Sequence, residues 1–444
     1  MSGKVGISKG IDWWLIWLYA LIVAIGLVSI FSVEFKPGDD FFQGIVGFEK
    51  NYSKQFFYLL FCAVLAVFIL LTDSKVFTAM ANLLYVIGIG LMLATFLVGK
   101  TVNGSKSWIP LGFMNLQPVE TAKIFTSLAL AKYLSLPDIN MTKPRVQLIA
   151  AGISFLPIVF SILQNETGLA LVYFAFLIPM YREGLPAIYP LLGASLSVLL
   201  VVTLLLPAKT LVIALTIIAG LCIVLMKRTI RRNKKPLYII LVLWLASTLF
   251  VGIAVPFLFK HVFQGYQADR IFSMVGRDNP FETPEDTAEL TVPVKKKPVE
   301  NYNVKQSKIA IGSGGFLGKG FLKGTQTQGD FVPEQHTDFI FTSLGESFGF
   351  LGTTLLMLLY LLMLLRIIFI AERQRSVFSR VYAYSVAAIL FFHVAINIGM
   401  TIGLAPVIGI TLPLMSYGGS SLLTFTILIF VLIKLDSDRQ MVLR

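Results

Sequence analysis

Long apolar blocks separated by short polar connectors dominate the sequence, and most of the blocks contain no charged side chain. A helix of about 20 apolar residues crosses a bilayer core. The blocks are continuous and do not alternate, which excludes a membrane β-barrel. The pattern predicts an all-α polytopic membrane protein with about twelve transmembrane helices, at residues 13–33, 55–72, 78–98, 118–135, 146–163, 167–181, 186–206, 209–226, 237–259, 349–370, 382–403 and 411–433.

Positive residues concentrate in alternate connectors, which sets the predicted orientation. The opposite connectors are poorer in them, and the first holds acidic residues instead. Because cytoplasmic loops carry the excess of Lys and Arg, both termini are predicted to lie inside. The basic positions are Lys75, Lys143, Arg145, Arg182, the run 227–235, Arg373, Arg375, Arg380, Lys434, Arg439 and Arg444.

One connector, residues 260–348, is too long and too polar to be a simple link. With both termini inside, it lies on the outer face. Long ordered loops usually carry function. We therefore divide the chain into N-terminal membrane helices at 1–259, an extracytoplasmic catalytic loop at 260–348 and C-terminal membrane helices at 349–444.

Composition supports the membrane interpretation. The 444 residues are 56% hydrophobic and 14% charged, with a mean hydropathy of +0.80, whereas soluble domains are about 25% charged. The net charge of +13 is explained by topogenic Lys and Arg, so no nucleic-acid partner is expected. Cys62 and Cys222 both lie in apolar blocks and are interpreted as small hydrophobic residues rather than a disulfide.

Two glycine-rich segments are candidates for chemistry. The run 312–315 lies between Lys308 and Lys319, and its backbone N–H groups could bind an anion or form only a tight turn. Residues 406–421, PVIGITLPLMSYGGSS, contain small residues at membrane depth. These allow close helix packing, or else a broken backbone that is buried or lines a cavity.

Five segments together resemble the SEDS family (shape, elongation, division and sporulation proteins), and the RodA branch more than the FtsW branch. They are QPVETAK at 117–123 after Trp108, QNETGLA at 164–170, GTQTQ at 324–328, PEQHTDFIF at 333–341 and the segment at 406–421. Similarity to this family implies a peptidoglycan glycosyltransferase in the bacterial inner membrane. It would polymerise lipid II, a disaccharide-pentapeptide on undecaprenyl pyrophosphate, during cell elongation. Its implied partner is a class B penicillin-binding protein that crosslinks the glycan strands.

The resemblance implies attack by a sugar 4-hydroxyl on the anomeric carbon of the lipid-pyrophosphate donor. A carboxylate that takes the hydroxyl proton contributes roughly 10²–10⁴-fold. Cationic side chains, or a divalent cation such as Mg²⁺, would face the leaving pyrophosphate. We predict Asp278 as the base, since it falls near the position of the family's acid counted from Arg270. Asp286 is the alternative, and a solvated loop acid is the other interpretation of either residue.

Further residues are predicted to bind substrate. Glu120 and Lys123 are three residues apart and share a helix face, where an ionisable pair is functional or a buried structural pair. His336 and Asp338 are too few for a metal site and are interpreted as hydrogen-bonding loop anchors. His393 is a lone histidine in a predicted span and is interpreted as a packing contact rather than a ligand. The full substrate-binding set is Lys106, Glu120, Lys123, Glu166, Lys308, Lys319, His336, Asp338 and Ser416.

The chain departs from the family pattern in four places. The family has about ten helices, and we interpret the hairpin 186–226 as the addition; two more spans preserve sidedness. Ser107 stands where the family usually has arginine, with Lys106 beside it, which supplies charge but no bidentate fork. Asn165-Glu166 replaces Pro-Asp, and residues 281–299 are an insertion in the loop.

Two other functions are compatible with these features. Many helices with broken glycine-rich segments and intramembrane charges also fit a lipid II flippase or transporter. A non-catalytic scaffold for the penicillin-binding protein is the second alternative. The long outer loop with candidate carboxylates favours the enzyme.

Overall fold

The computed structural model describes residues 10–36, 47–102, 105–262 and 302–439, together with Ala268 and Phe272. Asp278, Asp286 and the insertion 281–299 lie outside the described residues. The chain divides into two units: a main unit, Met1–Pro186 with Asn303–Arg444, and an insert unit, Ala187–Tyr302. The three-part division by membrane sidedness, at residues 259/260 and 348/349, remains a prediction.

The main unit begins with helices that correspond to the first six predicted spans. They are α1 (Trp13–Glu34), α3 (Asn51–Leu71), α4 (Ser74–Val98), α5 (Pro118–Leu134), α6 (Pro144–Leu163) and a helix broken into α7 (Thr167–Val172), η2 (Tyr173–Phe176) and α8 (Leu177–Arg182). Three short antiparallel strands join α4 to α5, which the sequence pattern did not predict: β1 (Lys100–Val102), β2 (Ser105–Pro110) and β3 (Asn115–Leu116), in the order β1-β2-β3.

The main unit resumes with α16 (Tyr302–Gly314), α17 (Thr325–Gln328), α18 (Ile340–Glu372), α19 (Val377–Thr401) and α20 (Gly419–Ser437). Helix α18 starts before the predicted span at 349–370, but it is kinked at Gly349, whose φ of 63° and ψ of −158° are non-helical. Glycine tolerates this conformation because it has no Cβ. The predicted span thus begins at the kink.

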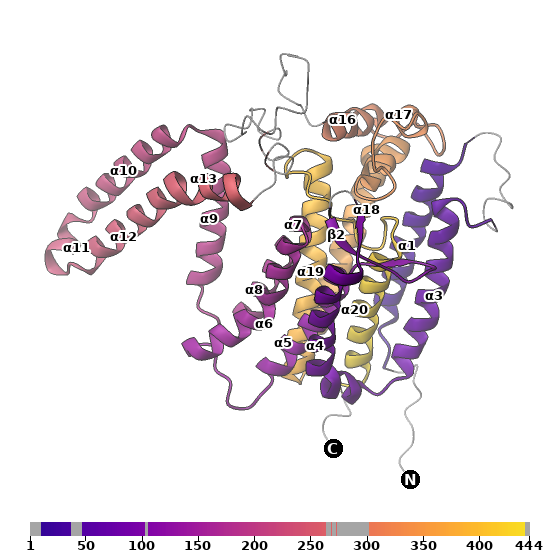
Figure 1. Ribbon diagram of the computed structural model, residues 1–444, viewed down its shortest axis with the longest axis horizontal. Coiled ribbons are helices and arrows are strands. Elements are labelled where there is room, and N and C mark those ends of the chain that lie inside the picture. The colour runs from indigo at the N-terminus through magenta and orange to yellow at the C-terminus, as the bar shows by residue number, and fades with distance from the viewer. Residues whose placement is uncertain are drawn as a thin grey trace, which may run out of the picture. The chain divides into compact units, whose positions relative to one another are not determined.

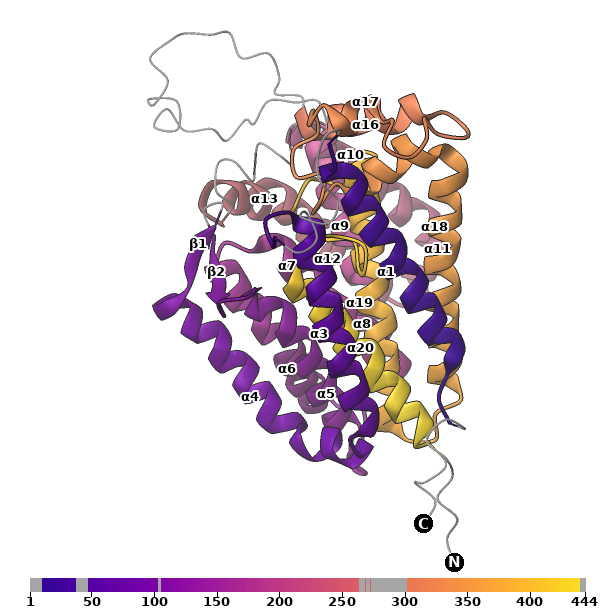
Figure 2. The same ribbon diagram turned by 90° about the vertical axis from the view of Figure 1, so that its right-hand side faces the viewer.

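Helices α19 and α20 form the centre of the main unit. Helix α20 packs against α3, α5 and α19, and α19 packs against α5 and α18. In their membrane-span windows, 67% of α19 and 83% of α20 is buried, against 22% of α3. The start of α1 and the end of α20 lie at one end of the unit, and α16 and α17 at the other (Figures 1 and 2). The predicted topology requires the start of α1 and the end of α20 to lie on one side.

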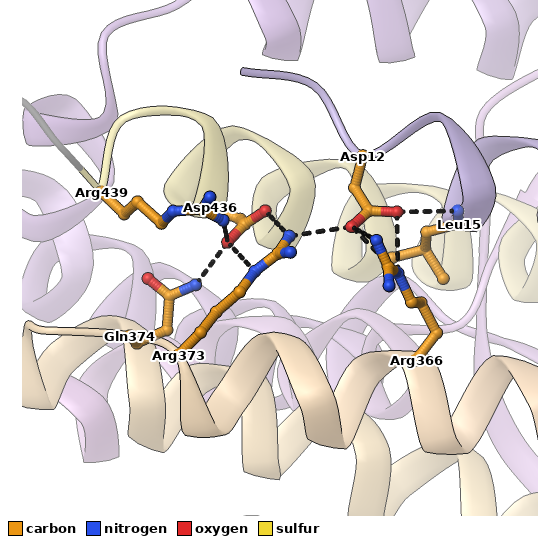
Figure 3. A network of polar contacts seen from close by, with 7 residues as sticks. All are labelled: Asp12, Leu15, Arg366, Arg373, Gln374, Asp436 and Arg439. Atoms are coloured by element: carbon orange, nitrogen blue, oxygen red, sulfur yellow. Dashed lines mark hydrogen bonds and ion pairs between the residues drawn. The ribbon is translucent and has the colours of Figure 1, made fainter. Parts of the chain in front are cut away.

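An ion cluster joins α1, α18 and α20 at the end where the termini lie (Figure 3). Asp12 caps α1 by accepting the N–H of Leu15 and also pairs with Arg366, whose Nη2 lies 2.7 Å from Oδ2. Arg373 bridges Asp12 and Asp436. The cluster connects three helices that are far apart in the sequence.

The insert unit comprises α9 (Ile188–Leu205), α10 (Ala208–Leu225), α11 (Lys227–Arg232), α12 (Lys235–Leu249), η3 (Phe250–Ala254), α13 (Val255–Phe257) and η4 (Leu258–Val262). Helices α10 and α12 pack together, and Trp244 Nε1 donates to Thr216 Oγ1 at 3.0 Å. The hairpin predicted at 186–226 therefore consists of α9 and α10.

Each of the twelve predicted spans overlaps a helix or a broken helix, but the last was predicted to start too early, at residue 411, because residues 411–418 are not helical and α20 begins at Gly419. Among the residues that the structure describes, nine helices are long and apolar enough to cross a membrane. The segments Thr167–Arg182 and Ile188–Thr203 are apolar but shorter. Helix α5 does not qualify, and it carries Glu120 and Lys123. The chain is therefore a multi-pass, predominantly helical membrane protein.

Candidate functional site

The centre of the candidate site is the non-helical segment 402–418 between α19 and α20. Asn397 of α19 holds it, because Nδ2 donates to the carbonyl oxygen of Ile410 at 2.6 Å and to that of Asp338 at 2.8 Å. Ser416 Oγ accepts the N–H of Leu412 at 2.8 Å and donates to the Thr337 carbonyl at 2.6 Å. The segment is thus fastened to the loop that precedes α18.

Neighbouring helices approach this segment closely. A Cβ added at Gly168 of α7 would lie 2.0 Å from the carbonyl oxygen of Ile408, and one at Gly26 of α1 would lie 2.7 Å from Met415 Cα. A larger residue at either glycine would displace backbone. Of the two interpretations left open by the sequence, the structure shows a broken backbone buried in protein.

A buried cluster of ionisable side chains contacts segment 402–418. Lys123 Nζ of α5 is 3.2 Å from Glu120 Oε2, with both side chains almost fully buried. Nζ also lies 2.7 Å from Nε2 of His393 in α19, and Nδ1 of that ring is 3.2 Å from the Thr411 carbonyl oxygen. The shared helix face of Glu120 and Lys123 is confirmed. His393 packs edge-to-face against Phe425, as a packing role predicts, and its ring also hydrogen-bonds to the lysine.

A second carboxylate, Glu166, precedes α7 and receives hydrogen bonds from β2. Its Oε1 lies 2.6 Å from Ser107 Oγ and 2.8 Å from Ser105 Oγ, and it accepts from Gln117 Nε2 at 3.1 Å. Burial raises the pKa of Glu166 above its ordinary value, although these hydrogen bonds oppose the rise.

Lys106 does not join the Glu166 cluster. Successive strand residues point to opposite faces, so the serines on either side of it face Glu166. The Lys106 ammonium instead donates to the carbonyl oxygen of Phe96, at 2.7 Å. In this structure Ser107, and not Lys106, occupies the place next to Glu166.

At the α16–α17 end, Glu346 organises the loop. Its side chain is fully buried and its carboxylate accepts from Lys319 Nζ at 2.7 Å, from the N–H groups of Gln326 and Thr327, and from Thr327 Oγ1 at 2.6 Å. These contacts hold the start of α17. Lys319 is thus paired with an internal carboxylate.

Three other predicted residues lie at the same end. Lys308 is exposed on α16, and its side chain passes over Gly403, where an added Cβ would meet Nζ at 2.4 Å. The His336 carbonyl accepts the N–H of Tyr417 at 2.8 Å, and the two rings are 5.7 Å apart. With the Asp338 carbonyl bound by Asn397, these residues anchor the loop to the segment 402–418.

The structure therefore separates the predicted residues into two groups. Glu120, Lys123 and Glu166 lie inside the helix bundle, whereas Lys308, Lys319, His336 and Asp338 lie at the α16–α17 end, and Ser416 connects the two levels. Sequence reasoning missed Glu346 and the role of His393. For His393 the available signal was a polar side chain within an apolar block, which is a functional candidate by default; Glu346 lies before the span predicted at 349–370 and gave no such signal.

The described residues contain no group of three or more His, Cys, Asp or Glu side chains that could hold a metal ion. Asp278 and Asp286 lie outside these residues, so a divalent cation facing the pyrophosphate remains a prediction. The interior cluster offers a cationic donor, Lys123, beside one carboxylate, Glu120, both shielded from water.

Comparison with known proteins identifies the family. The FtsW/RodA/SpoVE family model, described as cell cycle protein, matches residues 12–216 and 187–441. A Treponema pallidum relative named peptidoglycan glycosyltransferase RodA is 30% identical, covering 96% of this chain and 97% of its own. A Coxiella burnetii relative named FtsW is 31% identical, covering 99% and 100%.

Solved structures show the same fold. A chain from a peptidoglycan synthase complex that coordinates polymerization and crosslinking superposes with a TM-score of 0.66 at 23% identity, covering 97% of this chain and 99% of that chain. The chain therefore belongs to the FtsW/RodA/SpoVE family, the family of membrane proteins that its own sequence motifs predict.

Proposed function

We propose that this protein is a peptidoglycan glycosyltransferase of the bacterial inner membrane that polymerises lipid II into glycan strands during cell elongation. Membership of the family and the relative named peptidoglycan glycosyltransferase RodA support the activity. A relative named FtsW is equally similar, so the assignment to elongation rests on the GTQTQ and PEQHTDFIF segments.

The observation that carries the proposal is the buried cluster of Glu120, Lys123 and Glu166 beneath a broken membrane segment. Ionisable side chains at membrane depth are costly and mark substrate sites. His393, which contacts Lys123, also contacts Thr411 of segment 402–418, and that segment is hydrogen-bonded to the loop at residues 334–339. A lipid-linked sugar substrate needs such a site, because its chain stays in the membrane while its polar headgroup reacts at the surface.

The proposed reaction has one bond formed and one broken. Asp278, or alternatively Asp286, takes the proton of the acceptor 4-hydroxyl as its oxygen attacks the anomeric carbon. The bond from that carbon to the pyrophosphate oxygen breaks, and the undecaprenyl pyrophosphate departs with the bonding electrons. Lys308, which is exposed on α16, is the cation that we propose for the departing negative charge.

A class B penicillin-binding protein is the proposed partner. The solved relative belongs to a complex that coordinates polymerization with crosslinking. In such a complex, the partner would crosslink each strand as it leaves the glycosyltransferase. A scaffold role is compatible with catalysis in this arrangement.

The test is polymer formation from purified lipid II by the purified protein with its penicillin-binding partner. Glu120→Gln and Lys123→Ala should each reduce the rate about tenfold or more, because each removes a charge from a water-shielded site. Thr126→Val is the matched control on the same helix: Thr126 is fully buried and its hydroxyl has no hydrogen-bond partner. Movement of lipid II across vesicles without polymer would instead identify a flippase.

A further inference from the structure

The segment 227–235 of the insert unit is the densest concentration of positive charge in the chain, and we call it the basic turn. It lies between α10 and α12 and contains the short helix α11 (Figure 1). Both flanking helices are long and apolar enough to cross a membrane. The basic side chains of the turn are all exposed: Lys227, Arg228, Arg231, Arg232, Lys234 and Lys235.

The basic turn has no carboxylate of its own. Between Glu183 and Asp269 the sequence contains no acidic residue. Within the part of the chain that the structure describes, none of the basic side chains of the turn forms an ion pair. Like charges four residues apart on a helix, such as Lys227 and Arg231, repel each other. The turn therefore carries uncompensated positive charge, which an anionic partner would stabilise.

Basic residues of the main unit are arranged differently. Arg182 pairs with Glu372 at 3.0 Å, and Arg380 pairs with Glu183 at 2.8 Å. Arg373 lies between two aspartates. These residues belong to predicted cytoplasmic connectors, as the basic turn does, but their charges are compensated within the protein. The absence of compensation is thus a property of the turn and not of cytoplasmic connectors in general.

Two general roles of basic residues leave most of this charge unexplained. Orientation in the membrane needs few positive residues, and the connector at 73–77 has only Lys75. The helix dipole favours cations in the last turn of α11, where Arg231 and Arg232 lie. The same dipole disfavours Lys227 and Arg228 in the first turn.

The position of the turn indicates which partner it meets. Helix α10 ends at Leu225 and α12 begins at Lys235, so the turn is held at both ends by apolar helices. A six-residue helix such as α11 is only about 9 Å long, close to the screening length of about 8 Å at physiological salt. Tyr238, in the first turn of α12, is 63% exposed, and tyrosine is enriched at membrane interfaces. The charges therefore lie at the level of the lipid headgroups.

From this arrangement we infer that the basic turn binds the anionic headgroups of membrane phospholipids and holds the end of the α10–α12 hairpin at the membrane surface. The basic residues of α11 lie within about 140° of its circumference, so they face the headgroup layer together. Arginine binds phosphate through two parallel hydrogen bonds. Basic clusters next to a membrane helix attract anionic lipids in this way. The interaction does not depend on glycosyl transfer.

Native mass spectrometry of the full-length protein in mild detergent tests this inference. Phosphatidylglycerol and phosphatidylcholine with the same acyl chains are added in equal amounts, since only the first carries a net negative charge. The measured quantity is the ratio of their dissociation constants. We expect phosphatidylglycerol to bind at least about tenfold more tightly, because each basic residue near an anionic surface contributes roughly fivefold. This preference should decrease steeply as the salt concentration rises.

A pair of matched variants locates the site. Arg231→Gln with Arg232→Gln should lower the preference for phosphatidylglycerol about fivefold or more. Lys143→Gln with Arg145→Gln is the control, because it removes the same charge from another predicted cytoplasmic connector. It should change the preference less than about twofold. All four side chains are exposed, so the substitutions should have little effect on folding.

Hydrogen exchange gives a second readout that needs no variant. Addition of phosphatidylglycerol to the wild-type protein should slow amide exchange in residues 227–235, and phosphatidylcholine should not. Equal affinity for the two lipids, an equal loss in the two double variants, or protection of a different segment would each overturn the inference. Binding of soluble polyglutamate without a preference for phosphatidylglycerol would also overturn it and would indicate an acidic protein partner instead.

Discussion

Arg373, at the end of α18, is the residue whose loss should destabilise the main unit most clearly. Its Nε donates to Asp436 Oδ1 at 2.9 Å, and its Nη2 contacts Asp436 Oδ2 and lies 2.8 Å from Asp12 Oδ2. Both aspartate side chains are at most 1% exposed, against 23% for the arginine. Figure 3 shows the arginine between the two carboxylates.

The expected loss in the free energy of unfolding of Arg373→Met depends on the polar partners that each carboxylate retains. Asp12 retains Arg366 and the N–H of Leu15, and Asp436 retains Gln374 and Arg439. Removing one partner of a buried ion pair costs about 3–5 kcal/mol when the other charge is left alone. Since neither aspartate is left alone, we expect the lower part of that range, about 3 kcal/mol.

The free energy of unfolding would be measured by titrating the purified protein from a mild detergent into a denaturing one. Arg182→Met is the matched control at the same end of the unit. Arg182 also pairs with a carboxylate, Glu372, but the two side chains are 47% and 49% exposed, and exposed pairs contribute little. An Arg373→Met variant no less stable than Arg182→Met would refute the idea that this cluster fastens the three helices.

Three further predictions follow from the site and the fold. Asp278→Asn should lower the polymerisation rate by roughly 10²-fold with lipid II binding intact; a normal rate in Asp278→Asn with a slow one in Asp286→Asn would assign the base to the alternative residue. Burial alone would raise the pKa of Asp12, but its hydrogen bonds hold it below the ordinary value of 3.8. This carboxylate therefore stabilises the fold above that pH, and the contribution is lost on further acidification, so thermal unfolding at a series of pH values should show a smaller acid loss in Asp12→Asn. Single cysteines near Gly315 should react with an impermeant reagent from the periplasm and those near Arg231 should not; labelling near Arg231 from outside would reverse the predicted orientation.

Local features of the sequence predicted most of the helices and one contact of the site. A continuous apolar block of about 20 residues has few alternatives to a membrane helix, because every backbone hydrogen bond must be satisfied inside the segment. The pairing of Glu120 with Lys123 was predictable for a similar reason, since residues three apart on a helix must lie on one face.

The strand β2 is an element that the local sequence did not predict. The resemblance directed attention to Lys106 as the residue nearest the family's arginine. Strand alternation instead turns Ser105 and Ser107 toward Glu166, and Lys106 toward Phe96. A strand of six residues in a polar connector is too short for its hydrophobic pattern to be recognised. Neither the strand nor the face that each of its residues occupies could therefore be predicted from the sequence.

Contacts between distant helices were decided only by the tertiary structure. His393 and Lys123 are 270 residues apart, and Glu346 meets the start of α17 across a loop. In a helix that is apolar on all sides, composition does not indicate which face meets which neighbour. The sequence by itself thus determined the membrane helices, their family and the Glu120–Lys123 pair. The packing of α5 against α19 and α20 brought a histidine, in addition to the carboxylate, into contact with the lysine.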